Sequence, residues 1–223
     1  MFNYQITAGV WLFIVIALTI SILSLYVSRW YLPMKMKGAY LKSITALAAA
    51  VETKDSGTVG HAQRVAQVTV AVAKKLGMTG HDLERIEYAA LLMDIGKANV
   101  PQAILNKKDP LTPEELEIVR SHSKLGAEMV AAVPFLADID KYILHHHEYW
   151  DGTGYPAGLK GEAIPLASRI LAIAADYDAM ISERPYHHAW NPADAIEEIR
   201  ENIGNKYDAK VGSIFLEMLS HGS

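Results

Sequence analysis

The sequence predicts an all-α domain that follows a single transmembrane helix. Three observations predict this class. No side chain from Met1 to Ser28 is charged, and most of that stretch is apolar. The later segments place apolar residues three and four positions apart, which is the spacing of one helix face. No alternating run bounded by turn residues indicates a β-sheet.

The transmembrane helix is expected at Ala8–Val27. A helix of about 20 apolar residues crosses a hydrocarbon core of about 30 Å. A cleaved signal peptide would have a basic start and a shorter apolar core, so we expect an uncleaved anchor. The length and terminal position also argue against a buried core helix. Basic residues follow the span and none precedes it, which places the N-terminus outside and the following domain in the cytoplasm. These basic residues are Arg29, Lys35, Lys37 and Lys42.

The anchor is expected over residues 1–30, a juxtamembrane linker helix within residues 31–52, and one domain over residues 53–219. We expect Pro33 to close the juxtamembrane segment, and the Ala- and Leu-rich run Ala39–Val51 to form the linker helix. Helical spacing predicts further helices near Val59–Leu76, Leu83–Met93, Glu114–Val133, Leu166–Met180 and Pro192–Ile203.

A short sequence pattern predicts the start of one helix. Thr112 precedes Pro113, and Glu115 lies three positions after the threonine, which is the pattern of a capping box with proline at the first helical position. The long irregular stretch Trp150–Pro165 is rich in glycine and proline. A loop of that length inside a helical domain is more often functional than a plain connection.

The amino-acid composition limits the kinds of metal site and partner that the chain can have. The chain has no cysteine, so a disulfide framework and a thiolate metal site are excluded, and any metal must be held by His, Asp or Glu. The formal net charge of −4 gives no reason to expect DNA binding.

The most unusual run is His145-His146-His147-Glu148, directly before the glycine-rich loop. Clustered imidazoles next to a loop favour a metal site, although a polar helix end is the alternative. Neighbouring helix residues point about 100° apart, so at most two of the three histidines can reach one ion. Three isolated candidates lie upstream, namely His61, Asp94 and His122. Each alone is more often structural than ligating.

The runs LLMDIGK, SHSKLG, HHEYWDGTGYPAGLKGEAIP, SRILAIAADYDAM and SERPY, taken together, resemble the HD-GYP family over about residues 51–215. That bacterial family is an all-helical subset of the HD superfamily of metal-dependent phosphohydrolases. Its members hydrolyse cyclic di-GMP to pGpG or GMP with two or three metal ions, often iron or manganese. The resemblance therefore implies a bacterial cyclic di-GMP-related protein, and the expected transmembrane helix would anchor it in the inner membrane.

The resemblance also implies a damaged metal site. Met93 stands where the family has histidine, and Ala175 stands where it has aspartate. Asp176 is the alternative carboxylate but is poorly placed to replace that aspartate, because a shift of one helical position turns the side chain by about 100°. One metal position thus keeps only His61 and Asp94. The neighbouring position keeps its full ligand set of Asp94, His122, His146 and His147. We expect one divalent ion (Fe, Mn or Zn) rather than two or three.

By the same resemblance, Lys97 and Arg184 match positions that meet the phosphates, and Asp94 and Lys97 are the residues expected to serve catalysis. Tyr155 is expected near the nucleotide, and His187 stands where a lysine or arginine is usual. Ordinary surface charge is the alternative for Lys97 and Arg184.

The leading hypothesis is a catalytically impaired phosphodiesterase homologue that binds a cyclic di-GMP-like nucleotide and a metal. It would act as a sensor, or as a docking module for diguanylate cyclase (GGDEF-type) proteins, and a homodimer is compatible with either role. An active cyclic di-GMP phosphodiesterase with a reduced metal site is the rival. A purely structural domain that binds neither metal nor nucleotide is the third alternative.

Overall fold

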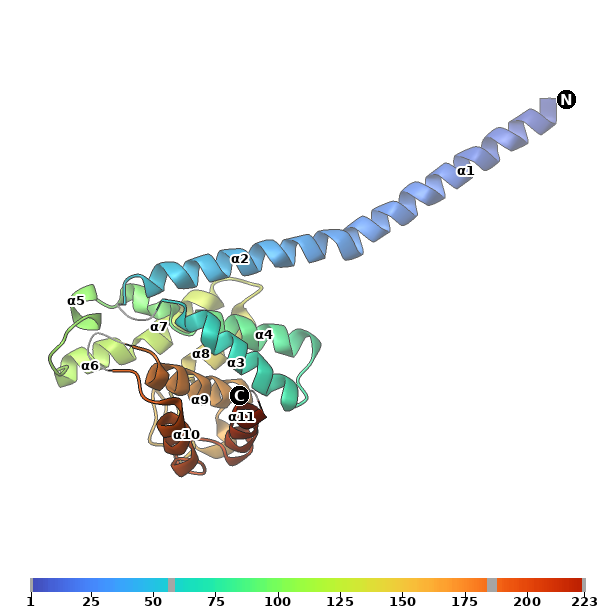
Figure 1. Ribbon diagram of the computed structural model, residues 1–223. Helices are drawn as coiled ribbons and strands as arrows, with labels where there is room; N and C mark the ends of the chain where they lie inside the picture. The colour runs from blue at the N-terminus through green and yellow to red at the C-terminus, as the bar shows by residue number, and fades with distance from the viewer. Residues whose placement is uncertain (1, 56–58, 184–187, 222–223) are drawn as a thin grey trace. The chain divides into compact units, whose positions relative to one another are not determined.

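The computed structural model describes residues 2–55, 59–183 and 188–221, and it is built from helices (Figure 1). The helices are α1 (Phe2–Tyr26), α2 (Leu32–Glu52), α3 (His61–Lys75), α4 (Gly80–Leu92), α5 (Gln102–Leu105), α6 (Pro113–Arg120), α7 (His122–Ala131), α8 (Asp140–Leu144), α9 (Leu166–Ile181), α10 (Pro192–Glu201) and α11 (Ala209–His221). The structure also contains one π-helical turn and three short 3-10 segments among the described residues. These are η1 (Val27–Tyr31), η2 (Ile95–Asn99), η3 (Ala137–Ile139) and η4 (Gly161–Ala163). The described residues contain no strand beyond one isolated bridge between Ile203 and Tyr207. The predicted all-α class is confirmed.

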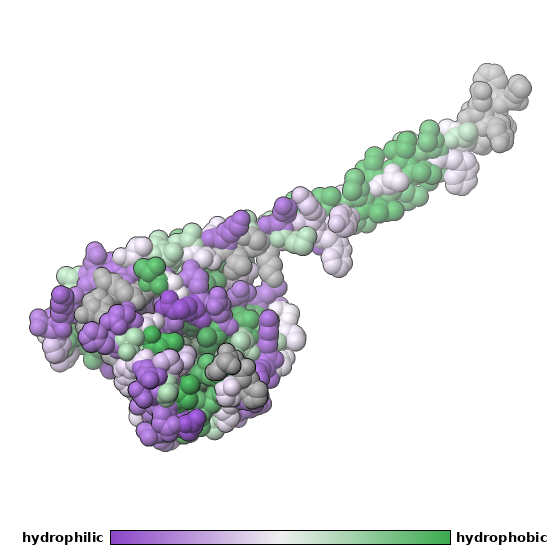
Figure 2. All heavy atoms as spheres, in the orientation of Figure 1, coloured by the Kyte–Doolittle hydropathy of each residue, from purple (hydrophilic) through white to green (hydrophobic). Residues whose placement is uncertain are grey.

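The chain divides into two compact units, Met1–Ser43 and Ile44–Ser223. The first unit contains one stretch, Ala8–Met36, that is long and apolar enough to cross a membrane, with a mean hydropathy of 2.5. Figure 2 shows the apolar side chains of this stretch in green on the molecular surface. The break expected at Pro33 was wrong. Pro33 lies within a helix that continues from α1 through the π-helical turn into α2. In that turn Leu32 N–H bonds to Val27 O, and such a wider turn lets a helix continue past a proline, which has no N–H to donate.

Most predicted helix positions are confirmed. Thr112 Oγ1 accepts a hydrogen bond from Glu115 N at 3.2 Å, and Glu115 Oε2 accepts one from Thr112 N at 2.8 Å, so the capping box is present. The single helix expected at Glu114–Val133 was wrong, because α6 and α7 meet at Ser121. The Ser121 hydroxyl donates back to Ile118 O at 2.6 Å, and such back-bonding bends helices. Helix α11 was not predicted.

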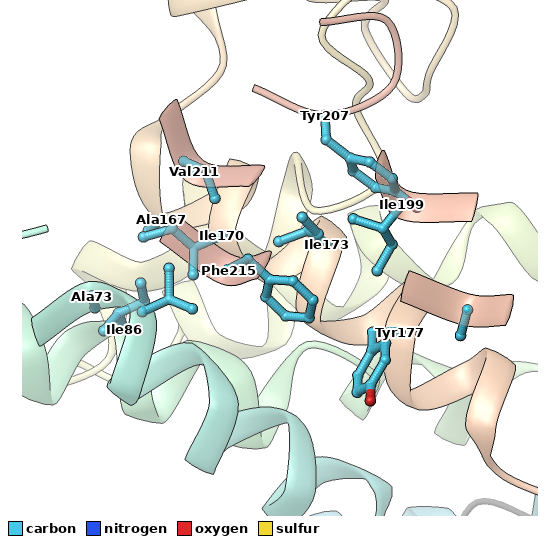
Figure 3. Packing of buried hydrophobic residues seen from close by; sticks show 12 residues of the cluster. Ala73, Ile86, Ala167, Ile170, Ile173, Tyr177, Ile199, Tyr207, Val211 and Phe215 are labelled. Carbon is cyan, nitrogen blue, oxygen red and sulfur yellow. The ribbon is translucent and has the colours of Figure 1, made fainter. Parts of the chain in front are cut away.

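The core lies where α3, α4, α9, α10 and α11 converge. Phe215 of α11 is fully buried, and its ring centroid lies 5.4 Å from that of Tyr177 in an edge-to-face arrangement. Figure 3 shows Phe215 among isoleucines from α4 and α9. Burying one such ring stabilises the fold by about 2 to 3 kcal/mol. This packing fixes α9, the helix that carries positions 175 to 178.

The N-terminus of α3 is capped from α2. Gly60 precedes α3 with φ 77° and offers no side chain. The Glu52 carboxylate instead accepts hydrogen bonds from Gly60 N at 2.8 Å and Ala62 N at 2.6 Å. A carboxylate at a helix N-terminus satisfies free N–H groups and complements the helix dipole. The cap holds the first turn of α3, and therefore His61, in place.

Candidate metal centre

Three histidines form a buried cluster. His122 begins α7, while His146 and His147 lie in the turn after α8. One ring nitrogen from each residue lies within 4.8 Å of the other two, close enough for one ion to be shared. His122 and His146 are 2% and 1% exposed. Three imidazoles around one point suit a divalent transition metal.

Hydrogen bonds orient two of these rings. His122 Nδ1 lies 2.7 Å from Val119 O, and His146 Nδ1 lies 2.6 Å from Ile143 O. A carbonyl oxygen can only accept, so both Nδ1 atoms carry the proton and both Nε2 atoms present lone pairs. The two Nε2 atoms face each other at 3.4 Å. Backbone carbonyls hold metal-ligating histidines in this way, so the cluster fits the implied ion.

The protonation state also fits. Burial and, to a smaller extent, the neighbouring His122 lower the pKa of His146 to about 4. Burial is likewise the main cause that lowers the pKa of His122 and holds the pKa of His147 well below the usual range. The three rings are therefore neutral at pH 7, which is the form that binds metal.

His145 takes no part in the cluster. Its Nδ1 lies 3.4 Å from Glu148 Oε1 instead. Two of the three consecutive histidines thus reach one point and the third does not.

Tyr155 is stacked against the cluster. Its ring lies 4.8 Å from the His147 ring at an interplanar angle of 20°, and the Arg120 guanidinium lies over it at 5.1 Å. Tyr155 therefore contacts both the histidine cluster and a cationic side chain, and it also lines the cavity described below.

Asp94 connects the cluster to Lys97. Asp94 Oδ1 lies 3.4 Å from His122 Nε2, and Asp94 Oδ2 lies 3.0 Å from Lys97 Nζ. Lys97 Nζ also lies 2.9 Å from Asp55 Oδ2. Burial alone would raise the pKa of Asp94, but Lys97 and the nearby histidines outweigh it and hold that pKa well below its usual range. Asp94 is therefore ionised, with Oδ1 toward His122 and Oδ2 toward Lys97.

His61 is held by a carboxylate that the sequence argument missed. His61 Nδ1 lies 2.6 Å from Asp178 Oδ2, while its Nε2 lies 3.8 Å from Asp94 Oδ2. Arg64 donates to the same carboxylate through Nε at 2.6 Å and Nη2 at 2.9 Å. Burial would raise the pKa of Asp178, but the hydrogen bonds from His61 and Arg64 outweigh it and lower that pKa to about 2. The sequence marks Asp178 only as part of the run DYDAM.

The two substituted positions offer no ligand. Met93 is 1% exposed and belongs to the core. Ala175 is a half-buried position of α9. The carboxylate of the adjacent Asp176 is bound elsewhere, to Lys206 Nζ at 2.9 Å and to the Tyr207 hydroxyl at 3.0 Å. His61 and Asp94 therefore lack the partners that a second ion would need at their side of the site.

Close backbone approaches shape the site. A Cβ on Gly96 would lie 2.0 Å from His122 O and 2.6 Å from Gly126 N, so only glycine allows η2 to approach α7 this closely. A Cβ on Gly154 would lie 2.4 Å from His147 O. The buried Glu148 carboxylate accepts hydrogen bonds from Ala157 N at 2.7 Å and Leu159 N at 3.1 Å, and so fixes the glycine-rich loop.

A cavity of about 490 Å³ opens beside the histidines. That volume lies within the range of about 300 to 1,000 Å³ typical of small-molecule sites. Its described lining residues include His122, His147, Tyr155, Lys97 and the segment Lys107–Leu111. Arg184 and His187, which the sequence places near the phosphates, lie outside the described residues.

Known proteins resemble this chain in sequence and in fold. A family model described as HD domain matches residues 45–211. A cyclic di-GMP phosphodiesterase response regulator of Xanthomonas campestris pv. campestris is 37% identical over 171 residues, covering 76% of this chain and 45% of the relative. A cyclic di-GMP phosphodiesterase of Thermotoga maritima is 38% identical over 169 residues, covering 75% and 46%.

The fold likeness extends to a solved structure, a cyclic GMP-AMP specific phosphodiesterase of Vibrio cholerae. It matches with a TM-score of 0.61 and 20% identity, covering 79% of this chain and 48% of that one. At that identity the match shows the fold alone. The chain spans less than half the length of each of the curated relatives named above.

Proposed function

The chain belongs to the HD domain family and is of the HD-GYP type, and from this premise we propose that it binds a cyclic dinucleotide but hydrolyses it poorly. The observation that carries the proposal is the contrast between the two halves of the site. The His122, His146 and His147 cluster is assembled, whereas Met93 is a core side chain beside the incomplete pair of His61 and Asp94.

The assembled half supports binding of one ion. His122, His146 and His147 would hold it, with Asp94 on the fourth side at 3.4 Å from His122 Nε2. An ion there would act as a Lewis acid toward a phosphate oxygen. Iron, manganese and zinc all accept such a set of imidazole and carboxylate ligands.

The incomplete half supports loss of catalysis. Phosphodiester hydrolysis by adjacent ions requires a symmetric clamp on the attacking and leaving oxygens. Here the side of Asp94 that faces His61 also meets the ammonium of Lys97, at 3.0 Å from Oδ2. Disturbing groups behind a ligand costs about 10- to 100-fold in metal affinity or activity, so the loss of two direct ligands at positions 93 and 175 should cost more.

The cyclic dinucleotide is proposed from the relatives and the cavity together. The Xanthomonas campestris and Thermotoga maritima relatives are named for cyclic di-GMP. The cavity of about 490 Å³ borders both the histidine cluster and Lys97, so a phosphate in it would meet the ion site. For the apolar stretch Ala8–Met36 we propose a single pass through the bacterial inner membrane with the domain in the cytoplasm, supported by its hydropathy and by the basic residues at its end.

The alternative is an active cyclic di-GMP phosphodiesterase that uses one ion. The assembled cluster favours it, because an ion held there would still act as a Lewis acid toward a phosphate oxygen. The two functions differ in rate, since active enzymes typically turn over at about 1 to 1,000 per second.

The test of the metal site is a paired substitution in the full-length chain, purified in detergent micelles and loaded with Mn(II) or Fe(II). His146→Ala is expected to lower bound metal at least 10-fold, because it removes one of three imidazoles. His145→Ala is the matched control, since that neighbouring ring contacts Glu148 instead. Metal content near one ion per chain in wild type and in the control supports the proposal. Equal metal content in all three proteins would refute it.

A further inference from the structure

A polar group of side chains lies close to Tyr155, outside the described lining of the cavity. Its centre is the carboxylate of Asp176 in α9, which Lys206 and Tyr207 contact from the turn between α10 and α11. The Lys206 ammonium also lies over the Tyr149 ring, 4.6 Å from the ring centroid. The histidine cluster does not include this carboxylate, which leaves it available to another ligand.

Two donors hold one oxygen of Asp176. Asp176 Oδ2 lies 2.9 Å from Lys206 Nζ and accepts a hydrogen bond from the Tyr207 hydroxyl at 3.0 Å. Asp176 Oδ1 accepts no hydrogen bond from the residues that the structure describes, and the side chain is 25% exposed. An ionised carboxylate can only accept hydrogen bonds, so Oδ1 suits a ligand that donates.

The carboxylate is held in place before any ligand arrives. Burial alone would lower the pKa of Lys206, but the charge of Asp176 outweighs burial and raises that pKa. The ammonium is therefore charged at pH 7 and pairs with Asp176. Tyr207 is 3% exposed, so its hydroxyl is fixed as well. A group that is already ordered loses little conformational entropy when it binds, which favours affinity.

The Asp176 group lies beside the ion site. Tyr155 stacks on His147 and lines the cavity. The backbone of Tyr149 packs against the same segment, since a Cβ on Gly154 would lie 2.4 Å from Tyr149 N. Asp176 acts on both tyrosines, because its charge adds to burial in raising the pKa of each. A ligand that fills the cavity and passes Tyr155 would therefore meet Asp176.

A cyclic dinucleotide has the shape and the donors for this arrangement. It carries two bases, one on each side of its ring of sugars and phosphates. The apolar cavity wall of Ile104, Leu111 and Val119 suits one base. The second base can present its polar edge to a carboxylate. Guanine offers two adjacent donors there, at N1 and N2, whereas adenine offers one donor at N6 beside the acceptor N1.

We propose that Asp176 recognises a guanine base of the bound cyclic dinucleotide through Oδ1, while Lys206 and Tyr207 hold Oδ2. This inference rests on the proposed function and assigns its base preference. Ligands that contain guanine are preferred over cyclic di-AMP, because an adenine in this place sets its N1 acceptor against the carboxylate and leaves both unsatisfied. Asp176 determines specificity without contacting the ion.

The test is isothermal titration of the Mn(II)-loaded full-length chain, in detergent micelles, with cyclic di-GMP, cyclic GMP-AMP and cyclic di-AMP. Wild type is expected to bind cyclic di-GMP about 10-fold more tightly than cyclic di-AMP, as one charge-assisted hydrogen bond allows. Cyclic GMP-AMP keeps one guanine and should bind nearly as well as cyclic di-GMP. Asp176→Asn should weaken cyclic di-GMP binding about 10-fold but leave cyclic di-AMP binding no weaker, because an amide can pair with adenine.

Two further variants separate recognition from charge and from packing. Glu128→Gln removes one negative charge from an exposed position of α7 and should leave all three affinities unchanged. Tyr207→Phe removes one donor to Oδ2 but keeps the carboxylate, so it should keep the preference for guanine. Equal binding of cyclic di-GMP and cyclic di-AMP by wild type, or equal losses for both in Asp176→Asn, overturns this inference alone. No binding of any of the three ligands by wild type overturns the proposed function together with it.

Discussion

Asp178 holds His61 in place, and we expect the loss of the Asp178 charge to destabilise the fold. Its carboxylate is 5% exposed and meets His61, Arg64 and the Ser182 hydroxyl, the last at 3.2 Å. The pKa of Asp178 falls from 3.8 to about 2. That lowering of the Asp178 pKa corresponds to about 2 kcal/mol of stability at pH 7. Asp178→Asn should therefore lower the free energy of unfolding by about 2 kcal/mol.

The pH dependence has a definite sign. The folded pKa lies below the unfolded one, so the contribution is complete above pH 4 and is lost as the pH falls through about 2. At pH 3 about half should remain. Urea unfolding of the full-length wild type and Asp178→Asn in detergent, at pH 7 and at pH 3, measures this difference. A difference below about 0.5 kcal/mol at pH 7, or one that does not shrink at pH 3, would refute the assigned role of Asp178.

Three further outcomes are expected. Gly96→Ala should destabilise the chain by more than 2 kcal/mol in urea unfolding, because the new Cβ would lie 2.0 Å from His122 O; an unchanged midpoint would contradict the close approach. Glu148→Gln should weaken metal retention in a chelator competition, because a neutral amide holds the Ala157 and Leu159 amides less well than the carboxylate; unaltered retention would count against that role. Metal-free protein should lose thermal stability as the pH falls from about 6.5 toward 4. The unfolded His146 takes up a proton near 6.5, whereas the folded one does so only near 4, and His146→Gln should show a shallower decline.

Local chemistry was predictable from the sequence where the cause lies within a few residues. The capping box at Thr112 depends on residues three positions apart, and the structure reproduces it. The limit of two ligands within the run 145–147 was predicted from the angle between neighbouring residues, and the turn after α8 brings two of them, His146 and His147, to the shared point.

Contacts between distant segments were not predictable in this way. The carboxylate that holds His61 is 117 positions away in the chain, and nothing in the local pattern pairs the two. The cap on α3 comes from Glu52 across a turn, although Gly60 itself offers no side chain. Lys97 matches a phosphate-binding position by sequence, and only the folded arrangement shows that two carboxylates already surround its ammonium.

The boundary between α6 and α7 was also not predictable from the sequence. The sequence spacing in residues 114–133 is continuous, yet the Ser121 hydroxyl bonds back to Ile118 O and separates α6 from α7. That short break places His122 at the first turn of α7, where its Nδ1 reaches Val119 O at 2.7 Å. The orientation of a candidate ligand thus depends on a local bend that hydrophobic spacing does not record.

The central claim is that the chain retains binding but has lost hydrolysis. Its most direct test is the rate at which the full-length chain, loaded with Mn(II) or Fe(II), hydrolyses cyclic di-GMP. The double variant Met93→His with Ala175→Asp is measured in the same assay. The expected result is about one bound ion and turnover below about 0.01 per second in wild type, far under the usual enzyme range of about 1 to 1,000 per second. The double variant should gain both metal and activity. Linear production of pGpG by wild type at about 1 per second or faster would contradict the account.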